Sequence, residues 1–503
     1  MTSPSAQAPD ALPLRVVVVG AGISGLCTAH RLARDVPGLE LTVLEASARV
    51  GGKIRTRRVA GLPVDTGPDA FLARAPELAA LVDELGLRDD VEGPAAGGAY
   101  VWSRGRMRRL PPGAMFGVPE RILPLLRSRL LSFTGTARAG LDLVKPRTSL
   151  PEDPSVGQLL RPRLGDEVFD RLVQPLIGGV HAGDADRLSA RSAVPEVAAM
   201  ARSGRSLVLT LRKRRAAAPA TAPGTRPAPP LVSLRGGMSA LTAAIVGRLG
   251  QARLVTGAPV RALRPREDGR WSVVTDDVTY EADHVVLAVP AHAAAPLLSP
   301  LAPSAAEVLA EIPYVGVANV TLALASSDVP DLPPDGTGFL VPPVEGELVV
   351  GCSWLTSKWP HLVNDDVVLM RCLVGRAGDD RFAAMDDDAL VAAVRETVAR
   401  MLGVTAEPLD VLVQRWPAAM PQYVVGHAER LERLDLALTE FPTLHLTGAA
   451  YRGVGLAGCV AQGTATAARI AAAARTAAAR TAAGAPASTP ASDPDPLHGG
   501  AVS

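Results

Sequence analysis

A glycine-rich turn close to the start of the chain constrains the fold more than any other feature. Its letters are GAGISG, residues 20–25. The β-branched run 14–19 before it predicts a short buried strand, and the apolar residues of 23–34 after it recur at helical spacing. Residues 40–44 predict a second strand. Together these segments predict a β-α-β unit, with the glycine turn between the first strand and the helix.

Each glycine of this turn has a physical use in binding a dinucleotide. Gly20 permits the tight turn, Gly22 lets the backbone approach a pyrophosphate, and Gly25 allows helix and strand to pack closely. Ile23 and Ser24 open the helix. A helix N-terminus offers unpaired N–H groups and a partial positive charge to phosphates.

Glu45 strengthens this interpretation. It ends the second predicted strand, about 20 positions after Gly25. A carboxylate there can accept hydrogen bonds from a ribose diol, whereas a 2′-phosphate would call for a basic residue. A glycine turn in this context predicts a dinucleotide site rather than an ordinary structural turn.

Composition and cysteine placement exclude several classes of protein. The net charge of +1 argues against nucleic-acid binding. The four cysteines are scattered without a CxxC pair, which fits neither a zinc site nor a disulfide framework and indicates a reducing cytoplasm. The first residues do not have the pattern of a secretory signal, and no apolar run reaches the roughly 18 residues of a spanning helix. We therefore expect a cytoplasmic protein.

A second glycine pair distinguishes flavin from nicotinamide cofactors. The run LEASARVGGKIRT, residues 44–56, resembles the amine-oxidase-like flavoprotein superfamily. Gly51 and Gly52 permit close approach of the backbone, and Arg49 or Lys53 can offset phosphate charge. The resemblance implies FAD as the cofactor, with these four residues in its site.

The likeness extends to three distant segments. LPVDTGPDAF (62–71) resembles the segment beneath the flavin, GAPV (257–260) resembles the strand whose backbone meets the adenine, and 447–458 resembles the closing strand and helix. Cys459 lies within that helix rather than in an attachment motif, so we expect non-covalent FAD. The FAD-binding residues that these segments imply are Gly67, Val260, Gly448, Val454, Gly455 and Leu456.

Two further stretches indicate one branch of the superfamily. QPLIGGVHAGD (174–184) with DRLS (186–189), and RWPAAMPQYVVGH (415–427), resemble segments of protoporphyrinogen and coproporphyrinogen oxidases. Trp416 and Tyr423 lie in the second stretch, and either a place beside the flavin or macrocycle or an ordinary core position fits them. Trp416 is included in the expected cofactor site. The resemblance covers roughly residues 14–470.

The resemblance implies a six-electron oxidation of a porphyrinogen in heme biosynthesis, with oxygen as electron acceptor and hydrogen peroxide as by-product. In having no spanning segment, the chain resembles the branch of these enzymes found in Gram-positive-type bacteria, which oxidises coproporphyrinogen III. Protoporphyrinogen IX is the alternative substrate. A third, more remote alternative is that the chain is another kind of amine-oxidase-like flavoenzyme. Arginine suits the substrate's carboxylates. Arg55 and Arg452 are the candidates for this role in the active site.

The expected fold is α/β, with a Rossmann-type FAD-binding domain interleaved with an α+β substrate domain and a mostly helical insertion. The expected ranges are 14–90, 230–300 and 440–475 for FAD binding, 91–212 for the helical region, 301–439 for substrate binding, 213–229 for a flexible loop, and 1–13 and 476–503 for disordered tails.

The sequence of the helical region is compatible with more than one binding partner. Its stretch 111–133 carries Arg121, Arg127 and Arg129 beside apolar residues. We interpret it either as a peripheral contact with anionic lipid or as a solvated helix over the substrate cleft. A homodimer and a contact with the next heme-pathway enzyme are further open partners, besides the porphyrinogen and oxygen.

Overall fold

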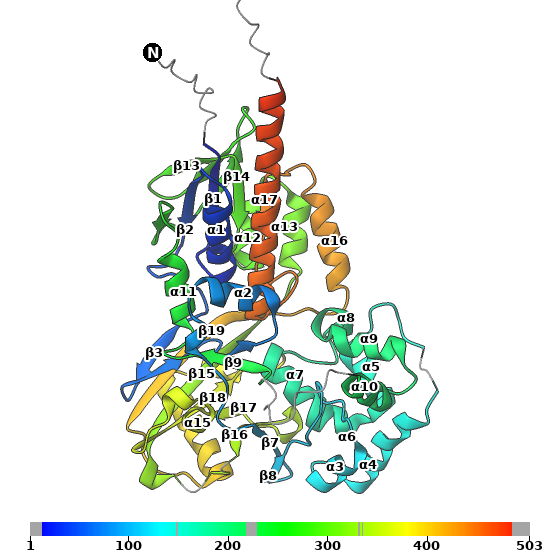
Figure 1. Ribbon diagram of the computed structural model, residues 1–503. Coiled ribbons are helices and arrows are strands. Elements are labelled where there is room, and N and C mark those ends of the chain that lie inside the picture. Colours follow the sequence, from blue (N-terminus) through cyan, green and yellow to red (C-terminus); the bar gives the residue numbers. More distant parts are fainter. Residues whose placement is uncertain (1–12, 147–148, 218–228, 330–331, 334, 485–503) are drawn as a thin grey trace, which may run out of the picture.

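The computed structural model describes residues 13–146, 149–217, 229–329, 332–333 and 335–484. One half of it is built around a parallel sheet with the order β10-β2-β1-β14-β20 (Figure 1). Both faces of this sheet are covered, which explains why its strands are apolar runs such as RVVVV. The predicted Rossmann-type α/β class is confirmed. The strands are β1 (Arg15–Val19), β2 (Glu40–Leu44), β10 (Arg253–Val255), β14 (His284–Leu287) and β20 (Leu444–Leu446).

Helices cover the two faces of this sheet. On one face lie α1 (Ile23–Asp35), α2 (Pro76–Glu84), α11 (Ser239–Val246) and α17 (Leu456–Gly484). On the other lie α12 (Ala291–Leu298), α13 (Pro303–Ala310) and α16 (His427–Ala437). The core therefore joins α13 and α16 to the five-stranded sheet, although both lie within the range expected for substrate binding.

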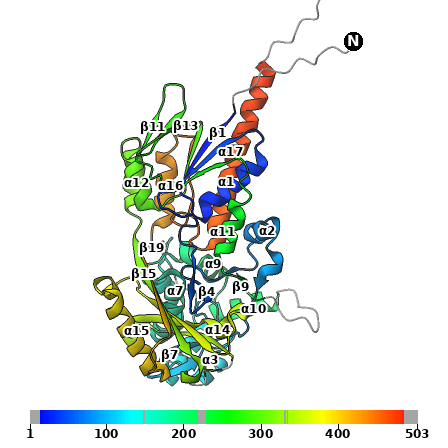
Figure 2. The same ribbon diagram turned by 90° about the vertical axis from the view of Figure 1, so that its left-hand side faces the viewer.

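The second half is a seven-stranded sheet with the order β19-β15-β18-β17-β16-β7-β8. Helix α15 (Asp387–Leu402) packs on one face of it. Figure 2 shows β15 and β19 rising from this sheet toward the five-stranded half. The strands are β7 (Gly98–Ser103), β8 (Arg106–Arg109), β15 (Tyr314–Ala325), β16 (Gly336–Leu340), β17 (Val349–Trp354), β18 (Val367–Val374) and β19 (Asp410–Pro421).

In the described part of the chain, short strands form three further sheets, of which β11-β12-β13 packs on the five-stranded sheet. The pairs are β3 (Thr56–Val59) with β4 (Leu62–Asp65), β9 (Leu231–Leu234) with β5 (Phe71–Leu72) and β6 (Val91–Glu92), and β12 (Trp271–Val274) with β11 (Ala262–Pro265) and β13 (Thr279–Ala282).

The helical part packs around its own apolar core. The prediction of helix across 91–212 is wrong for 98–109, which form a hairpin at the edge of the seven-stranded sheet. Its strands contain Tyr100, Val101 and Trp102, which favour strands, and Gly105 turns the chain with φ of +70°. The main helices are α3 (Ile122–Ser128), α4 (Phe133–Gly140), α5 (Val156–Leu164), the π-helix η3 (Phe169–Val173), α7 (Gln174–His181), α8 (Ala190–Ala193), α9 (Pro195–Ser203) and α10 (Leu207–Ala216).

Helical structure also extends into two segments expected to lack it. Helix α10 includes 213–216 of the predicted loop, and 218–228 lies outside the described residues. Helix α17 continues through 476–484, so the prediction of disorder is wrong there, because alanine has the highest helix propensity. Residues 1–12 and 485–503 of the predicted tails lie outside the described part of the chain.

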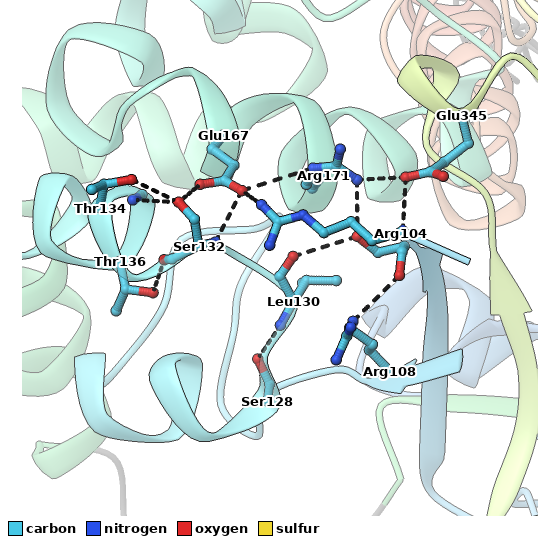
Figure 3. A network of polar contacts seen from close by, with 12 residues as sticks. Arg104, Arg108, Ser128, Leu130, Ser132, Thr134, Thr136, Glu167, Arg171 and Glu345 are labelled. Atoms are coloured by element: carbon cyan, nitrogen blue, oxygen red, sulfur yellow. Dashed lines mark hydrogen bonds and ion pairs between the residues drawn. The ribbon is translucent and has the colours of Figure 1, made fainter. Parts of the chain in front are cut away.

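A polar network attaches the helical part to the seven-stranded sheet (Figure 3). Glu167 accepts a hydrogen bond from the Ser132 N–H at 3.0 Å and pairs with Arg104 in the turn between β7 and β8. Arg171 in η3 pairs with Glu345, which follows β16. Since η3 leads directly into α7, this network holds the start of α7 against the sheet.

Among the described helices, none combines the length and the apolar character needed to cross a membrane.

Candidate functional site

The first glycine turn has tight packing at two positions and open space at the third. Gly20 has φ of +102°, and a Cβ there would lie 2.7 Å from the Ala288 carbonyl oxygen. A Cβ on Gly25 would collide with the Gly20 carbonyl. A Cβ on Gly22 would meet nothing within 4 Å. The backbone at the start of α1, with Ile23 and Ser24, therefore faces a space that a ligand can enter.

Glu45 lies beside this turn. One carboxylate oxygen accepts the Ala21 N–H at 2.8 Å, and the other accepts the Ser47 N–H at 2.9 Å and its hydroxyl at 2.8 Å. The Glu45 carbonyl accepts the Ala258 N–H at 2.9 Å. The half-buried Val260 follows, and its backbone makes no hydrogen bond to other residues that the structure describes. The predicted ribose and adenine positions are thus neighbours.

The second glycine turn packs directly on the first. The Gly51 N–H donates to the Ala21 carbonyl at 2.8 Å, and a Cβ on Gly52 would lie 3.1 Å from Gly22 Cα. The Arg49 guanidinium donates to three carbonyls of this turn, including that of Gly52 at 2.6 Å. Arg49 therefore braces the turn with its hydrogen-bond donors.

Lys53, in the second glycine turn, carries a positive charge that is unpaired among the described residues. Its half-buried ammonium has no hydrogen bond or ion pair within the described part of the chain. Burial lowers the pKa of Lys53, and the side chains of Cys459 and His292 are close enough to interact with its charge. An anionic group beside Lys53 would favour its charged form. This unpaired cation next to two glycine turns suits a phosphate.

The segment 62–71 crosses the loop that carries Lys53. A Cβ on Gly67 would collide with the Lys53 carbonyl, so only glycine fits this crossing. The Thr66 carbonyl accepts Asn319 Nδ2 at 2.8 Å and Trp416 Nε1 at 2.9 Å. Trp416 therefore anchors this segment to the seven-stranded sheet. Asn319 was missed, although an amide within the apolar strand GVANVTLAL was a visible signal.

An ion cluster that sequence reasoning missed fixes the far end of this segment. Asp69 accepts a hydrogen bond from Lys358 and pairs with Arg371, each at 2.9 Å. Burial alone would raise the pKa of Asp69, but Arg371 and Lys358 hold it well below its usual range. Arg371 also donates to the Asp65 carbonyl at 2.7 Å. Three residues so distant in the sequence gave no local pattern to detect.

The loop between β20 and α17 supplies a second open helix start. Gly448 has φ of +137°, and a Cβ on Gly448 or Gly455 would meet nothing within 4 Å. Val454 and Leu456 flank Gly455 and are half-buried. The buried Thr447 hydroxyl has no hydrogen-bond partner in the described structure. The first N–H groups of a helix lack partners within it, so this end attracts negative charge.

The start of α1 packs on α17 about one to two turns after that helix begins. Helices α1 and α17 touch so tightly that a Cβ on Gly463 would lie 2.6 Å from the Ser24 carbonyl oxygen. Cys27 Sγ also lies 3.5 Å from the Val460 carbonyl oxygen. The open glycines, the Glu45 carboxylate and the Lys53 ammonium therefore surround one region. Its chemistry fits a dinucleotide with a pyrophosphate.

The two predicted substrate arginines have different surroundings. Arg55 is half-buried, and its Nη1 lies 3.3 Å from Gln414 Oε1 on β19. The Arg452 side chain is 57% exposed and pairs with Asp435 of α16 at 2.6 Å. Arg55 thus lies against the seven-stranded sheet, whereas Arg452 faces the surface beside α16. The structure does not bring them into contact.

The chain belongs to the family of flavin containing amine oxidoreductases, whose pattern it matches over residues 23–471. Within that family it resembles the coproporphyrinogen III oxidase of Bacillus subtilis (strain 168), with 34% identity over 90% of this chain and 96% of that protein. The enzyme of the same name from Propionibacterium freudenreichii subsp. freudenreichii is 36% identical over 90% of both chains.

A solved structure agrees with this placement. The crystal structure of a candidate protoporphyrinogen oxidase from Exiguobacterium sp. 255-15 superposes with a TM-score of 0.82 and 31% identity. The match covers 92% of this chain and 99% of that one. The flavin predicted from the glycine turns thus agrees with the family.

Proposed function

We propose that this chain is a coproporphyrinogen III oxidase that uses non-covalently bound FAD. The observation that supports this most is the similarity to enzymes of that name, at 34–36% identity along 90% of the chain. The open, positively charged region between the two helix starts supports a dinucleotide as the form of flavin.

The residues around that region have distinct proposed roles. Gly22 and the first turn of α1 hold the pyrophosphate together with Lys53, Glu45 holds the ribose, and the Val260 backbone meets the adenine. Gly67 and the start of α17 lie at the flavin. When bound, FAD accepts two electrons at a time, so a six-electron oxidation takes three rounds.

Several of the predicted cofactor side chains have a supporting role in this proposal. Arg49 shapes the second glycine turn, and Trp416 holds the Thr66 carbonyl, so both act through backbone they brace. Gly51 and Gly52 allow that turn to pack on the first.

Arg55 remains the first candidate for a substrate carboxylate. It lies between the second glycine turn and the face of the seven-stranded sheet, and Gln414 orients one of its nitrogens. Its planar fork suits a carboxylate. For Arg452 to take the same role, its ion pair with Asp435 would have to open.

Oxygen as electron acceptor, with hydrogen peroxide as product, is part of the same proposal. Protoporphyrinogen IX is the second candidate substrate, favoured by the name of the Exiguobacterium relative. A cytoplasmic enzyme, a homodimer and a contact with the following heme-pathway enzyme remain predictions. So does a contact of 111–133 with anionic lipid, for which exposed Leu123 and Leu126 beside Arg127 provide suitable chemistry.

A parallel assay tests the proposal. Purified protein with its bound flavin would receive coproporphyrinogen III or protoporphyrinogen IX, and porphyrin fluorescence, oxygen and hydrogen peroxide would be followed. We expect faster oxidation of coproporphyrinogen III, with oxygen consumed and peroxide formed. Faster oxidation of protoporphyrinogen IX would reverse the order of the two candidates. A flavin-loaded protein that oxidises neither above the spontaneous rate would contradict both.

A further inference from the structure

The segment between β19 and α16, residues 422–426, is attached to the helical part of the molecule. Gln422 Nε2 donates to the carbonyl of His181 at 2.9 Å, at the end of α7. The Tyr423 carbonyl accepts the Ser189 N–H at 2.8 Å, and the Val425 N–H donates to the carbonyl of Arg187 at 3.0 Å. These bonds fix the segment independently of the loop that lies on its other side.

That loop runs from Thr447 to Gly455 and leads into α17. The Tyr423 hydroxyl donates to the Ala449 carbonyl and accepts the Gly453 N–H, both at 2.7 Å. His427 Nε2 lies 2.8 Å from the Tyr451 carbonyl. A carbonyl oxygen only accepts, so Nε2 carries the proton of this bond. The two side chains thus hold three successive points of the loop.

The two rings form one buried unit. Their centroids lie 4.0 Å apart with an angle of 13° between the planes, and Tyr423 and His427 are 3% and 2% exposed. Burial lowers the pKa of His427 and raises the pKa of Tyr423, so both rings are neutral near pH 7. Such a unit is suited to holding backbone in place.

The loop depends on external support of this kind. Gly448 and Gly453 have φ of +137° and +131°, and glycine enters such conformations at a higher cost in chain entropy than other residues. A loop with two such positions has little intrinsic preference for one shape. Its last residues, Val454 and Gly455, start the helix whose N-terminus faces the proposed flavin.

We propose that Tyr423 and His427 are positioning residues for the flavin site. They hold the loop 447–455 in the shape that aims the first turn of α17 at the cofactor. Gln422 bonds to the end of α7, so the segment 422–426 and His427 connect the loop 447–455 to the helical part. The inference rests on the FAD site proposed above but not on the identity of the substrate.

The test compares full-length variants by FAD binding and by hydrogen exchange. Tyr423→Phe leaves the ring but removes both hydrogen bonds to the loop. We expect the dissociation constant of FAD to rise about tenfold, in line with the loss of one to two buried hydrogen bonds. In flavin-free protein, amide exchange in 448–456 should become faster. His427→Ala should act in the same direction.

Two variants serve as controls. His427→Gln retains a side-chain N–H that can reach the Tyr451 carbonyl, so most of the FAD affinity should return. Tyr100→Phe removes a hydroxyl bonded to Asp335 at 3.0 Å, far from this loop, and should leave both readouts unchanged.

The outcomes separate this inference from the proposed activity. Tyr423→Phe with wild-type FAD affinity and wild-type exchange in 448–456 would overturn the positioning role, even if its unfolding temperature fell. Wild-type protein that binds FAD but oxidises neither porphyrinogen would contradict the proposed activity alone. Wild-type protein that binds no FAD would contradict both.

Discussion

At the scale of single residues, Lys53 tests the phosphate site most directly. Its half-buried ammonium has no partner among the described residues, so a pyrophosphate would supply its missing counter-charge. We expect Lys53→Met to raise the FAD dissociation constant about 10- to 100-fold, the range for loss of one charge-assisted hydrogen bond. Flavin titration of the apoprotein measures this.

One control variant keeps the positive charge at position 53, and the other removes a lysine elsewhere. Lys53→Arg should lose less affinity than Lys53→Met, because it retains the cation. Lys213→Met removes an exposed lysine of α10 and should bind FAD as the wild type does. Equal FAD affinity for the wild type and all of these variants would show that Lys53 does not bind the phosphate.

Asp65 makes stability depend on pH. It accepts hydrogen bonds from the Thr56 hydroxyl and the Met238 N–H, but burial raises its pKa from 3.8 to about 6. The folded protein therefore binds this proton more tightly than the unfolded chain does, and stability falls as pH rises from 4 through 6. The difference amounts to about 3 kcal/mol between the two limits.

The measurement compares wild type with Asp65→Asn. The gap between their free energies of unfolding should change across pH 4 to 7, with the wild type losing stability relative to the variant as pH rises. Other titrating groups are shared by the two proteins and cancel. A gap that stays constant with pH would show that Asp65 has an ordinary pKa.

At the scale of secondary-structure elements, Glu167 should contribute more to stability than an average surface carboxylate. It pairs with Arg104 and accepts the N–H and hydroxyl of Ser132, so it joins the β7–β8 turn to the start of α4. We expect Glu167→Gln to lower the free energy of unfolding by about 1–3 kcal/mol. Glu196→Gln, at an exposed site on α9, should change it by less than about 0.5 kcal/mol.

Denaturant unfolding of the two variants measures the difference. Similar curves for Glu167→Gln and Glu196→Gln would mean that the network of Figure 3 adds little to the attachment of the helical part.

The elements predicted from sequence were those with local signals. The turn 20–25 and its flanking strand and helix follow from spacing and glycine placement alone, and the structure has them at nearly the same bounds. The hairpin 98–109 was missed because its partner, β16, lies more than two hundred residues later in the chain. The hydrogen bond between Tyr423 and Gly453 was missed as well, because it joins residues that are 30 positions apart and that only the fold brings together.

Individual roles were harder to predict than positions. Arg49 lies at the predicted turn but donates to its carbonyls, and Arg452 lies within the loop 447–455 but pairs with Asp435. A sequence pattern shows where a side chain starts. It does not show where a long, flexible side chain ends, because that depends on groups that the fold brings near.

At the scale of the whole molecule, FAD should stabilise the entire fold. Its proposed site takes residues from 20–25, 45, 51–53, 67, 260 and 447–456, so unfolding of the five-stranded half would destroy it. The bonds of Asn319 and Trp416 to the Thr66 carbonyl link the site to the seven-stranded sheet as well. With FAD at a hundred times its dissociation constant, the expected gain is about 2.7 kcal/mol. Removing the flavin should lower the unfolding temperature, and adding FAD back should restore it.

Lys53→Met provides the control for this effect. At the same FAD concentration its unfolding temperature should rise less than that of the wild type. An unfolding temperature that does not respond to FAD in the wild type would contradict a site of this extent.

The pairing of α1 with α17 has a consequence for synthesis. Gly22 leaves the ribosome long before Gly455, by roughly 20 to 90 seconds at about 5–20 residues per second. During that interval the nascent chain contains the first glycine turn and α1 of the proposed FAD site but lacks α17. If α17 closes the proposed site, we expect flavin to be retained only once translation has passed this helix, so that bound cofactor marks polypeptides whose synthesis reached it.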